Sequence, residues 1–459
     1  MSKKEITKEQ KIYELSLIWK EAEYNFAFWD NLDKTFDWDK EYREALDKVI
    51  NTNNLYDYYL ELMRFITLLK DGHTSVWFPK EIIYSKDYFS FLPIEVQFID
   101  NKYVITNIDE SLVDIISRYS IIKQINGMNI EKYIEDNIYP YIWHEKKDSS
   151  SHQTIAFLLR GKEGTSVSLS LDDGVKEYNV TINRIHKAMK YAYQKALFKY
   201  EDTKSLFSSK SHSIEFTKDD IAIITIDSMM NDELPNDIFN NFNILKKAKG
   251  YVIDIRHNSG GNSNNSDYVA SLFIGSSFKN DNTYHPIHIG AYKAWGRYND
   301  LDKMTEDEFY KKYKDNESFD FYEKMFKICH HTLFEESHYD KTISNVPGKL
   351  DGPIVLLISS DTASAAENFV NVMKYNANAV LVGSATYGST GQPLNYNLES
   401  GGGFRICTRK SKALDKSDFI NIGFKPDIEC SLSIEDYKNS NDSVMKKGLE
   451  FIRNQLKNY

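Results

Sequence analysis

Cysteine is scarce in this sequence, which has three among its 459 residues. Cys329, Cys407 and Cys430 are too few for a disulfide framework and too scattered for a thiolate metal site. This usage fits a reducing compartment. We therefore expect no structural disulfide, no metal and no other cofactor.

Long apolar runs are also missing. No stretch approaches the ~20 apolar residues of a membrane-spanning helix, and residues 1–9 lack the apolar core of a signal peptide. We expect no membrane span and a cytoplasmic protein. A chain from which a leader had been removed would instead be secreted or periplasmic.

The sequence also lacks an excess of basic charge. Lysine and arginine total 57 against 67 aspartates and glutamates, which gives a net charge of −10, and no basic cluster stands out. Nucleic acid is therefore not an expected partner. The sequence does contain 41% hydrophobic and 14% aromatic residues, enough for sizeable cores, over the length of about three domains.

Residues 1–80 are predicted to form an N-terminal helical unit. Apolar residues recur with helical periodicity between residues 10 and 70, for example at Tyr56, Tyr59 and Leu60. The pattern ends at an Asp-Gly-His sequence, where the glycine stops the helix. His73 is therefore expected on a turn.

Residues 85–185 are predicted to form a small β-rich domain. Short runs such as 94–99 and 121–125 alternate with turn signals. The segment 120–127, Ser-Ile-Ile-Lys-Gln-Ile-Asn-Gly, resembles the GD-x-I-x-x-I-N-G segment of PDZ domains, with Tyr119-Ser120 in place of Gly-Asp. The resemblance implies a PDZ-like fold. PDZ domains bind peptide C-termini by adding a strand at a sheet edge, and whether this domain does so is left open.

Residues 186–215 are predicted to be a linker with a connecting helix, and residues 216–459 an α/β domain. Strands such as 221–226 and 353–358 alternate there with helical patterns, which favours a parallel sheet covered by helices. A polar insertion at about 276–348 has two interpretations. It is either a lid that shapes the substrate site or an embellishment packed on the sheet.

Ser364 is the candidate nucleophile. It follows the apolar run 353–358 and opens a helical pattern, so a substrate could approach it closely beside helix N–H groups that favour negative charge. The alternative is that Ser364 only caps the helix, because Ser364 and Glu367 have the spacing of a capping box.

Four short segments of the α/β part share a recognisable pattern. They are D-x-R-x-N-x-G-G at residues 254–261, T-A-S-A-A-E at 362–367, G-x-x-T-x-G at 383–388 and G-x-x-P-D at 423–427. In this order they resemble segments of the S41 peptidase family, the tail-specific and tricorn-core proteases. The resemblance implies a catalytic α/β domain of the crotonase/ClpP-like sheet-and-helix class, preceded by the helical unit and the PDZ-like domain.

Acyl transfer also needs hydrogen-bond donors for the oxyanion. Gly260 and Gly261 follow a predicted strand and offer unobstructed backbone N–H groups. With the N–H of Ala365 they are predicted to form an oxyanion hole. The alternative is a tight turn into the next helix.

The general base is predicted to be His73. Tail-specific proteases use a lysine after T-x-G, where this sequence has Ser389, so a Ser–Lys dyad is excluded at the usual place. The tricorn-like branch uses a histidine that precedes the PDZ-like domain, and Asp-Gly-His at 71–73 resembles its D-G-H segment. With a reference pKa near 6.5, this base predicts activity that rises through roughly pH 6–7.5.

The residue that orients His73 is left open. The tricorn core uses a glutamate upstream of G-x-x-P-D, where this sequence has Ile420, and a serine before its histidine, where this sequence has Gly72. The remaining candidates are Glu367, Asp418 and Asn421.

Other polar residues receive lesser roles. Asp254 and Arg256 are predicted to fix a strand end, and His257 is a weaker competitor for the base. The insertion contains His330, His331 and His338. Without cysteines at metal spacing or an H-E-x-x-H helix, these histidines predict no metal site.

The sequence therefore predicts a serine endopeptidase or processing peptidase that acts on peptides or proteins through an acyl-enzyme on Ser364. Two alternatives stay open here. One is a non-catalytic binding protein on the same scaffold, like the retinoid-binding relatives of the family, and the other is a hydrolase of small esters. No oligomeric state is predicted.

Overall fold

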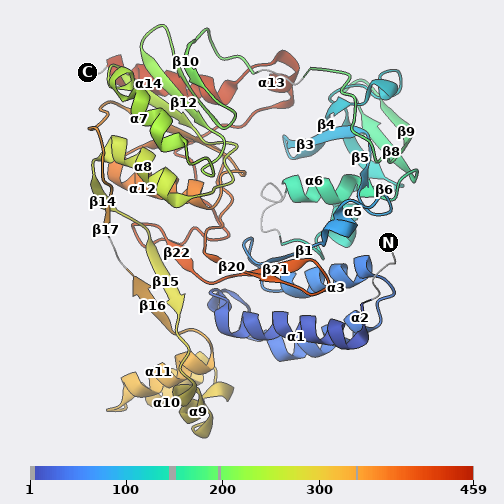
Figure 1. The fold of residues 1–459 in the computed structure, drawn as a ribbon, viewed down its shortest axis with the longest axis vertical. Coiled ribbons are helices and arrows are strands. Elements are labelled where there is room, and N and C mark those ends of the chain that lie inside the picture. Colours follow the sequence, from blue (N-terminus) through green and yellow to red (C-terminus); the bar gives the residue numbers. More distant parts are fainter. Residues whose placement is uncertain (1–5, 144–150, 195–197, 338–339, 458–459) are drawn as a thin grey trace.

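The computed structural model describes residues 6–143, 151–194, 198–337 and 340–457. Figure 1 shows an α/β region, a β-rich region opposite it, and a group of N-terminal helices along one side of the molecule. No helix within the described ranges is long and apolar enough to cross a membrane.

The α/β region is built on a seven-stranded sheet of order β10-β11-β12-β13-β18-β19-β23. Its strands span Lys204–Ser208, His212–Phe216, Ile221–Ile226, Gly250–Asp254, Ile354–Ile358, Val380–Gly383 and Ile428–Glu429. β10 and β11 are antiparallel, and the strands from β12 to β23 run parallel. β13 and β18 are buried along their whole length, as expected for parallel strands covered on both faces.

Helices cover both faces of this sheet (Figure 1). They are α7 (Leu234–Leu245), α8 (Ser263–Ile274), α12 (Ala365–Ala377) and α14 (Ser443–Lys457). Val252 shares an apolar cluster with Leu449 and Ile452 of α14, whereas its neighbours Tyr251 and Ile253 join the cluster that contains α7, α8 and α12. Alternate residues of β13 therefore face the two layers.

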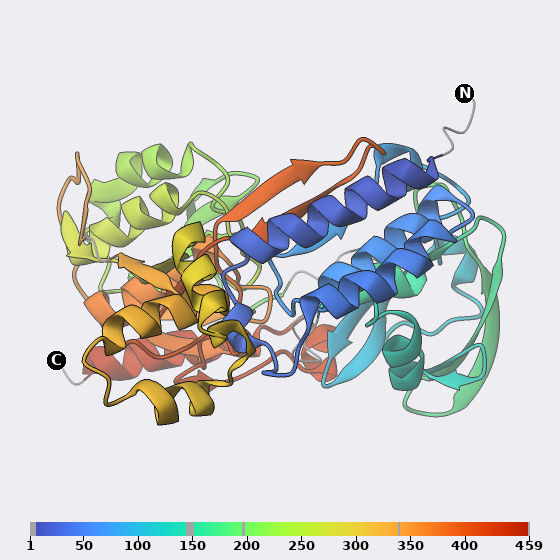
Figure 2. The same cartoon turned by 90° about the horizontal axis from the view of Figure 1, so that it is seen from below.

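The N-terminal helices are α1 (Lys8–Asn25), α2 (Trp38–Ile50) and α3 (Leu55–Thr67). They pack against a three-stranded sheet of β1 (Ser75–Trp77), β21 (Gly403–Cys407) and β20 (Pro393–Asn397). β1 follows the helices in the chain, whereas the β20–β21 hairpin projects from the α/β half and lies alongside α1 (Figure 2). The two distant parts of the chain thus share one sheet.

A buried carboxylate joins these parts. Glu14 of α1 is fully buried and accepts hydrogen bonds from Tyr58 Oη (2.8 Å), the Ser400 backbone N–H (2.8 Å) and Ser400 Oγ (2.6 Å). Ser400 lies in the turn between β20 and β21, so Glu14 links the helical unit to the hairpin.

The β-rich region has its own sheet and core. Its strands are β3 (Ile94–Ile99), β4 (Lys102–Ile108), β5 (Ile121–Ile125), β6 (Met128–Asn129), β8 (Ser166–Asp172) and β9 (Glu177–Asn183), with helices α5 (Ile130–Asn137) and α6 (Ser151–Leu159). Short strands β2 (Ser90–Phe91) and β7 (Arg160–Gly161) pair beside it. The predicted strands 94–99 and 121–125 are confirmed to the residue.

The insertion forms a protruding hairpin that carries helices. It contains β14 (Ser277–Lys279), β15 (Asn282–Pro286), α9 (Gly290–Tyr298), α10 (Glu306–Tyr313), α11 (Phe319–Cys329), β16 (Phe334–Ser337) and β17 (Asp340–Thr342). The helices have a small separate core around Phe309 and Phe326, and β22 (Lys410–Lys412) pairs with β15. Figure 1 shows these helices at the end of the molecule farthest from the seven-stranded sheet.

The segment 186–215 differs from the predicted linker. Its described residues contain no α-helix, and β10 and β11 already belong to the seven-stranded sheet. β11 buries His212 and Ile214 with a period of two, and the lysines and serines around the strands obscured this alternation in the sequence.

Candidate active site

The loop between β18 and α12 presents Ser364 at the start of the helix. Ser364 has φ 55° and ψ −122°, a left-handed conformation that a residue with a Cβ adopts only under constraint. Its side chain makes no capping hydrogen bond. The interpretation of Ser364 as a simple helix cap is therefore wrong.

His73 reaches this serine from the turn after α3. Its Nε2 lies 3.3 Å from Ser364 Oγ, although the two residues are 291 positions apart. The turn is held by Thr74 Oγ1, which donates to Asp71 Oδ2 (2.6 Å) and accepts from the Cys407 N–H of β21 (3.0 Å). The β1–β21 pairing thus places His73 against Ser364.

The other ring nitrogen of His73 meets Ser389, a residue to which the sequence assigned no orienting role. His73 Nδ1 hydrogen-bonds Ser389 Oγ, so a proton on Nδ1 leaves Nε2 free to accept from Ser364. A Cβ atom added to Gly72 would lie 3.0 Å from Ser389 Oγ and 2.7 Å from a ring carbon of Tyr387. There is thus no room for the serine that the family places before its histidine.

Glu367 supports Ser389 rather than touching His73. It is fully buried and accepts hydrogen bonds from Thr386 Oγ1 (2.5 Å) and from the backbone N–H groups of Gly388 (2.7 Å) and Ser389 (2.9 Å). Burial raises the pKa of this carboxyl to about 7 against the opposing effect of its donors. Glu367 therefore fixes the loop that presents Ser389.

Two predicted oxyanion donors have free N–H groups, and the third does not. Among the described residues, the N–H groups of Gly261 and Ala365 have no hydrogen-bond acceptor, whereas that of Gly260 donates to Asn258 Oδ1 (2.9 Å). Gly260 has φ 104°, and a Cβ on it would lie 2.7 Å from Ser364 Cβ. The lack of a side chain at Gly260 therefore lets its backbone lie close to Ser364, and the free donors are the N–H groups of Gly261 and Ala365.

The surroundings keep His73 uncharged. Burial lowers its pKa to about 4, and the positive charges of Arg405 and Arg409 act in the same direction. A neutral imidazole is the form that can accept a proton.

Two candidate orienting residues lie elsewhere. Asp418 is exposed and pairs with Lys412 at 3.2 Å. Asn421 Nδ2 donates to the Lys70 backbone O (3.1 Å), so it holds the segment before His73 and not the ring. Neither side chain orients the imidazole directly.

The other polar residues that the sequence singled out, Asp254, Arg256 and His257, lie in ion pairs or at the surface. Arg256 bridges Asp254 and Asp442, each at 2.7 Å, in a buried ion cluster at the end of β13. His257 is largely exposed and lies 3.9 Å from Asp361, a distance that allows only a weak charge interaction. Neither His257 nor Arg256 is hydrogen-bonded to Ser364.

Two histidines of the insertion, His288 and His331, stack with ring centroids 6.0 Å apart, but the described histidines there form no metal-binding group. His330 Nε2 bonds the Leu301 backbone O (2.9 Å), His331 lies 3.9 Å from Glu23, and His338 is outside the described residues. Over the described part of the chain, no group of three or more His, Cys, Asp or Glu side chains could hold a metal ion.

Comparison with protein families places this geometry in context. The profile of peptidase family S41 matches residues 220–430, which include Ser364, Ser389 and both glycines. A carboxyl-terminal-processing protease from Synechocystis sp. is 27% identical over 97 residues, which are 21% of this chain and 23% of that protein. The chain thus matches less than a quarter of that relative's length.

Solved structures resemble the chain over almost its whole length. A mutant of CPAF has a TM-score of 0.70 at 14% identity over 97% of this chain and 98% of that one. Mature CPAF complexed with lactacystin has a TM-score of 0.66 at 15% identity, with 97% and 99% covered. A putative peptidase from Parabacteroides merdae has a TM-score of 0.53 at 16% identity, with 97% and 96% covered. At such identities the likeness concerns the fold.

Proposed function

We propose that this chain, whose residues 220–430 match the profile of peptidase family S41, is a serine peptidase that hydrolyses peptide bonds through an acyl-enzyme on Ser364. The observation that carries the proposal is the 3.3 Å separation of Ser364 Oγ and His73 Nε2, next to backbone N–H groups that have no acceptor among the described residues. A nucleophile, a base and oxyanion donors are the parts that acyl transfer requires.

His73 acts as the general base and then as the general acid. Its neutral Nε2 takes the Ser364 proton as Oγ attacks the scissile carbonyl, and the N–H groups of Gly261 and Ala365 stabilise the negative oxygen of the tetrahedral intermediate. The imidazolium then gives its proton to the leaving amine, which leaves an acyl ester on Ser364. Water, activated by the same nitrogen, attacks this ester and releases the acid.

Ser389 takes the part that a carboxylate has in many serine peptidases. Its Oγ holds the Nδ1–H of His73 and so fixes the tautomer in which Nε2 accepts. Ser389 carries no negative charge, so it orients the ring with little electrostatic stabilisation of the imidazolium. Glu367, behind the loop, supplies rigidity.

Active-site labelling and substrate turnover test the proposal. We expect a fluorophosphonate to label the wild-type protein and not the Ser364→Ala variant, and we expect turnover of peptides as well as of activated esters. Ser359→Ala is a matched control, because this serine lies in the same loop and its Oγ donates to the Arg256 backbone O. A folded protein that is neither labelled nor active would support a binding protein, and turnover of esters alone would support an esterase.

A further inference from the structure

Asn258 is a fully buried asparagine between the nucleophile loop and the glycine turn at residues 260–261. Its side chain makes two hydrogen bonds: Nδ2 donates to the Ile226 backbone O at the end of β12 (3.0 Å), and Oδ1 accepts from the Gly260 N–H (2.9 Å). Its backbone O accepts from the N–H of Ala363 (3.1 Å), the residue before the nucleophile. Asn258 therefore joins three segments that meet at the candidate active site.

The peptide group between Gly260 and Gly261 is held at its carbonyl. The Met229 N–H donates to the Gly260 backbone O (3.0 Å). This peptide bond is trans, so its C=O and N–H groups point in opposite directions. The Gly261 N–H therefore points away from Met229, and it has no acceptor among the described residues.

The two glycines do not fix this direction by themselves. Gly260 has φ 104° and Gly261 has φ 142°, and glycine adopts many other backbone conformations at little cost because it has no Cβ. Asn258 holds the peptide group before Gly260, and Met229 holds the peptide group after it. With both groups held, the backbone angles of Gly260 are determined, and so is the direction of the Gly261 N–H.

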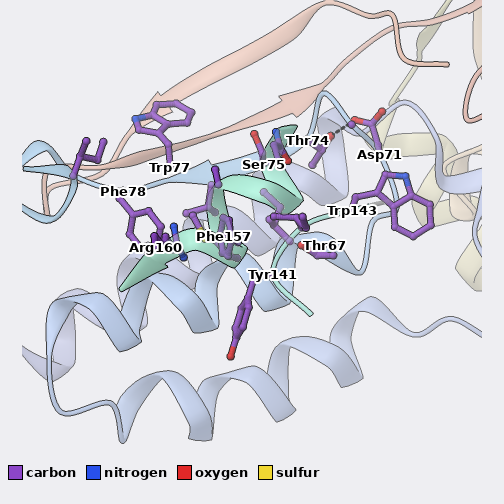
Figure 3. Close-up of a pocket in the computed structure, with 18 of the residues that line it drawn as sticks. Thr67, Asp71, Thr74, Ser75, Trp77, Phe78, Tyr141, Trp143, Phe157 and Arg160 are labelled. Atoms are coloured by element: carbon purple, nitrogen blue, oxygen red, sulfur yellow. Dashed lines mark hydrogen bonds between the residues drawn. The ribbon is translucent and has the colours of Figure 1, made fainter. Parts of the chain in front are cut away.

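A similar bond closes the turn that carries the other catalytic residue. Figure 3 shows the hydrogen bond from Thr74 to Asp71 (2.6 Å), two buried residues on either side of the segment that contains His73. Neither Asp71 nor Thr74 is hydrogen-bonded to Ser364. In both turns a buried polar side chain bonds a group two or three residues away, and the catalytic group lies on the turn that this bond closes.

We propose that Asn258 is a positioning residue of the oxyanion hole, which fixes Gly260 so that the Gly261 N–H meets the developing negative oxygen. The inference rests on the proposed peptidase function and adds to it the side chain that orients one of the two donors. The substrate oxygen becomes negative only as the tetrahedral intermediate forms. A change at Asn258 should therefore lower kcat and leave KM nearly unchanged.

Asn258→Leu tests the inference, because leucine has a similar shape and makes no side-chain hydrogen bond. We expect kcat for a peptide p-nitroanilide to fall about 10- to 100-fold, less than the loss on the order of 10²–10³ that follows removal of a complete oxyanion donor. A crystal structure of the variant should show the Gly260 carbonyl displaced from the Met229 N–H. This second measurement does not depend on activity.

Asn371→Leu is the matched control. Asn371 is also a fully buried asparagine whose Oδ1 accepts a backbone N–H, from Leu414 (3.0 Å), but it makes no hydrogen bond to the nucleophile loop or the glycine turn. We expect its kcat per folded molecule to equal that of the wild type.

Asn258→Asp keeps the test decisive if Asn258→Leu does not fold. The aspartate retains Oδ1, and its protonated form can also donate to the Ile226 O, so the ratio of its kcat to that of the wild type should fall as rising pH ionises the new carboxyl. A packing defect would give no such pH dependence.

Two results would overturn the inference and leave the peptidase proposal intact. They are an unchanged kcat in the folded Asn258 variant and an equal loss of kcat in Asn371→Leu. A wild-type protein without any turnover would instead contradict the peptidase proposal. The crystal structure of the Asn258 variant would still decide whether this side chain fixes the glycine turn.

Discussion

The two halves of the candidate active site are held in different ways. The nucleophile loop is tied to neighbouring loops by several local bonds: Thr362 Oγ1 donates to the Ile255 backbone O (3.0 Å), the Ala363 N–H to the Asn258 O (3.1 Å), and the Ser364 N–H to the Ser389 O (2.9 Å). His73, in contrast, sits on a single turn of another part of the chain. Its position depends on the β1–β21 pairing and on the contacts of the helical unit.

We therefore expect the first half to affect the reaction itself and the second half to affect whether the complete site forms. Ser364 and the N–H groups of Gly261 and Ala365 lie within the segment 220–430 that matches the family profile, and contacts within the α/β region hold them. His73 lies outside that segment and reaches Ser364 because the helical unit packs on the β20–β21 hairpin. A substitution in the first half should change the reaction, whereas a substitution in the docking surface should change the fraction of molecules in which the reaction is possible.

The largest expected effect is the loss of either member of the catalytic pair. Ser364→Ala, His73→Ala and the double variant should each lose activity by similar amounts, on the order of 10³-fold or more, because members of one catalytic unit are not additive. Steady-state kinetics on the three variants measures this. Ser364 makes no capping bond, so the melting temperature of Ser364→Ala should stay close to that of the wild type. An active Ser364→Ala protein would contradict the assignment.

A smaller loss is expected when the orienting hydroxyl is removed. Ser389→Ala should lower kcat about 10- to 100-fold with little change in KM, because His73 loses the partner that fixes its tautomer. Ser389→Thr, which retains a hydroxyl, should recover part of kcat. Thr390→Ala is the control, since the neighbouring buried hydroxyl contacts Asn368 and not the histidine. Equal effects at both positions would indicate that Ser389 has only a structural role.

The docking surface is expected to respond through stability. Glu14→Ala leaves Tyr58 and Ser400 without their acceptor and should cost about 2–4 kcal/mol of folding free energy in the helical unit. We expect an earlier unfolding transition by calorimetry and about a tenfold loss of activity at temperatures near that transition. Glu9→Ala, an exposed change in the same helix, should have neither effect. Loss of activity without any loss of stability would show that Glu14 acts on the site in another way.

The smallest expected effect is a displacement of the acid limb of the pH profile. Burial in the folded protein lowers the pKa of His73 to about 4, below the usual value of 6.5, so this imidazole stays neutral as the pH falls to about 5. We therefore expect kcat/KM to decline only below about pH 5, not through the pH 6–7.5 range that an unperturbed histidine predicts. Rates measured from about pH 4 to 8, with circular dichroism to confirm folding, decide between the two. A rise only above about pH 9 would implicate a lysine such as Lys410 or Lys412.

Sequence patterns predicted the parts of this protein that depend on local signals. The strands 94–99, 121–125 and 221–226 have the predicted bounds because strong apolar runs between turn residues leave little choice. The contact between Ser364 and His73 was predicted from the family resemblance. β10 and β11 were not predicted, because the edge strand β10 and its neighbour β11 contain polar residues, which weaken the strand signal.

The missed residues depend on contacts between distant segments. Ser389 lies 316 positions from His73, and the sequence identified it only as the residue in the place of the family's lysine, not as the partner of an imidazole. Asp418 was a plausible orienting residue by charge and position, but its side chain turns outward to Lys412.

Because β1 and β21 share one small sheet, that sheet can form only after both strands have been synthesised. A ribosome that adds about 5–20 residues per second completes the His73 turn roughly 15–60 s before it reaches Ser364, and it makes β21 later still. During that interval the growing chain contains His73 without Ser364, and then both residues without the strand on which the His73 turn docks. By the proposed mechanism, a nascent chain therefore has no complete catalytic site until β21 has emerged and paired with β1, so its own translation protects it and its neighbours on the ribosome from premature cleavage.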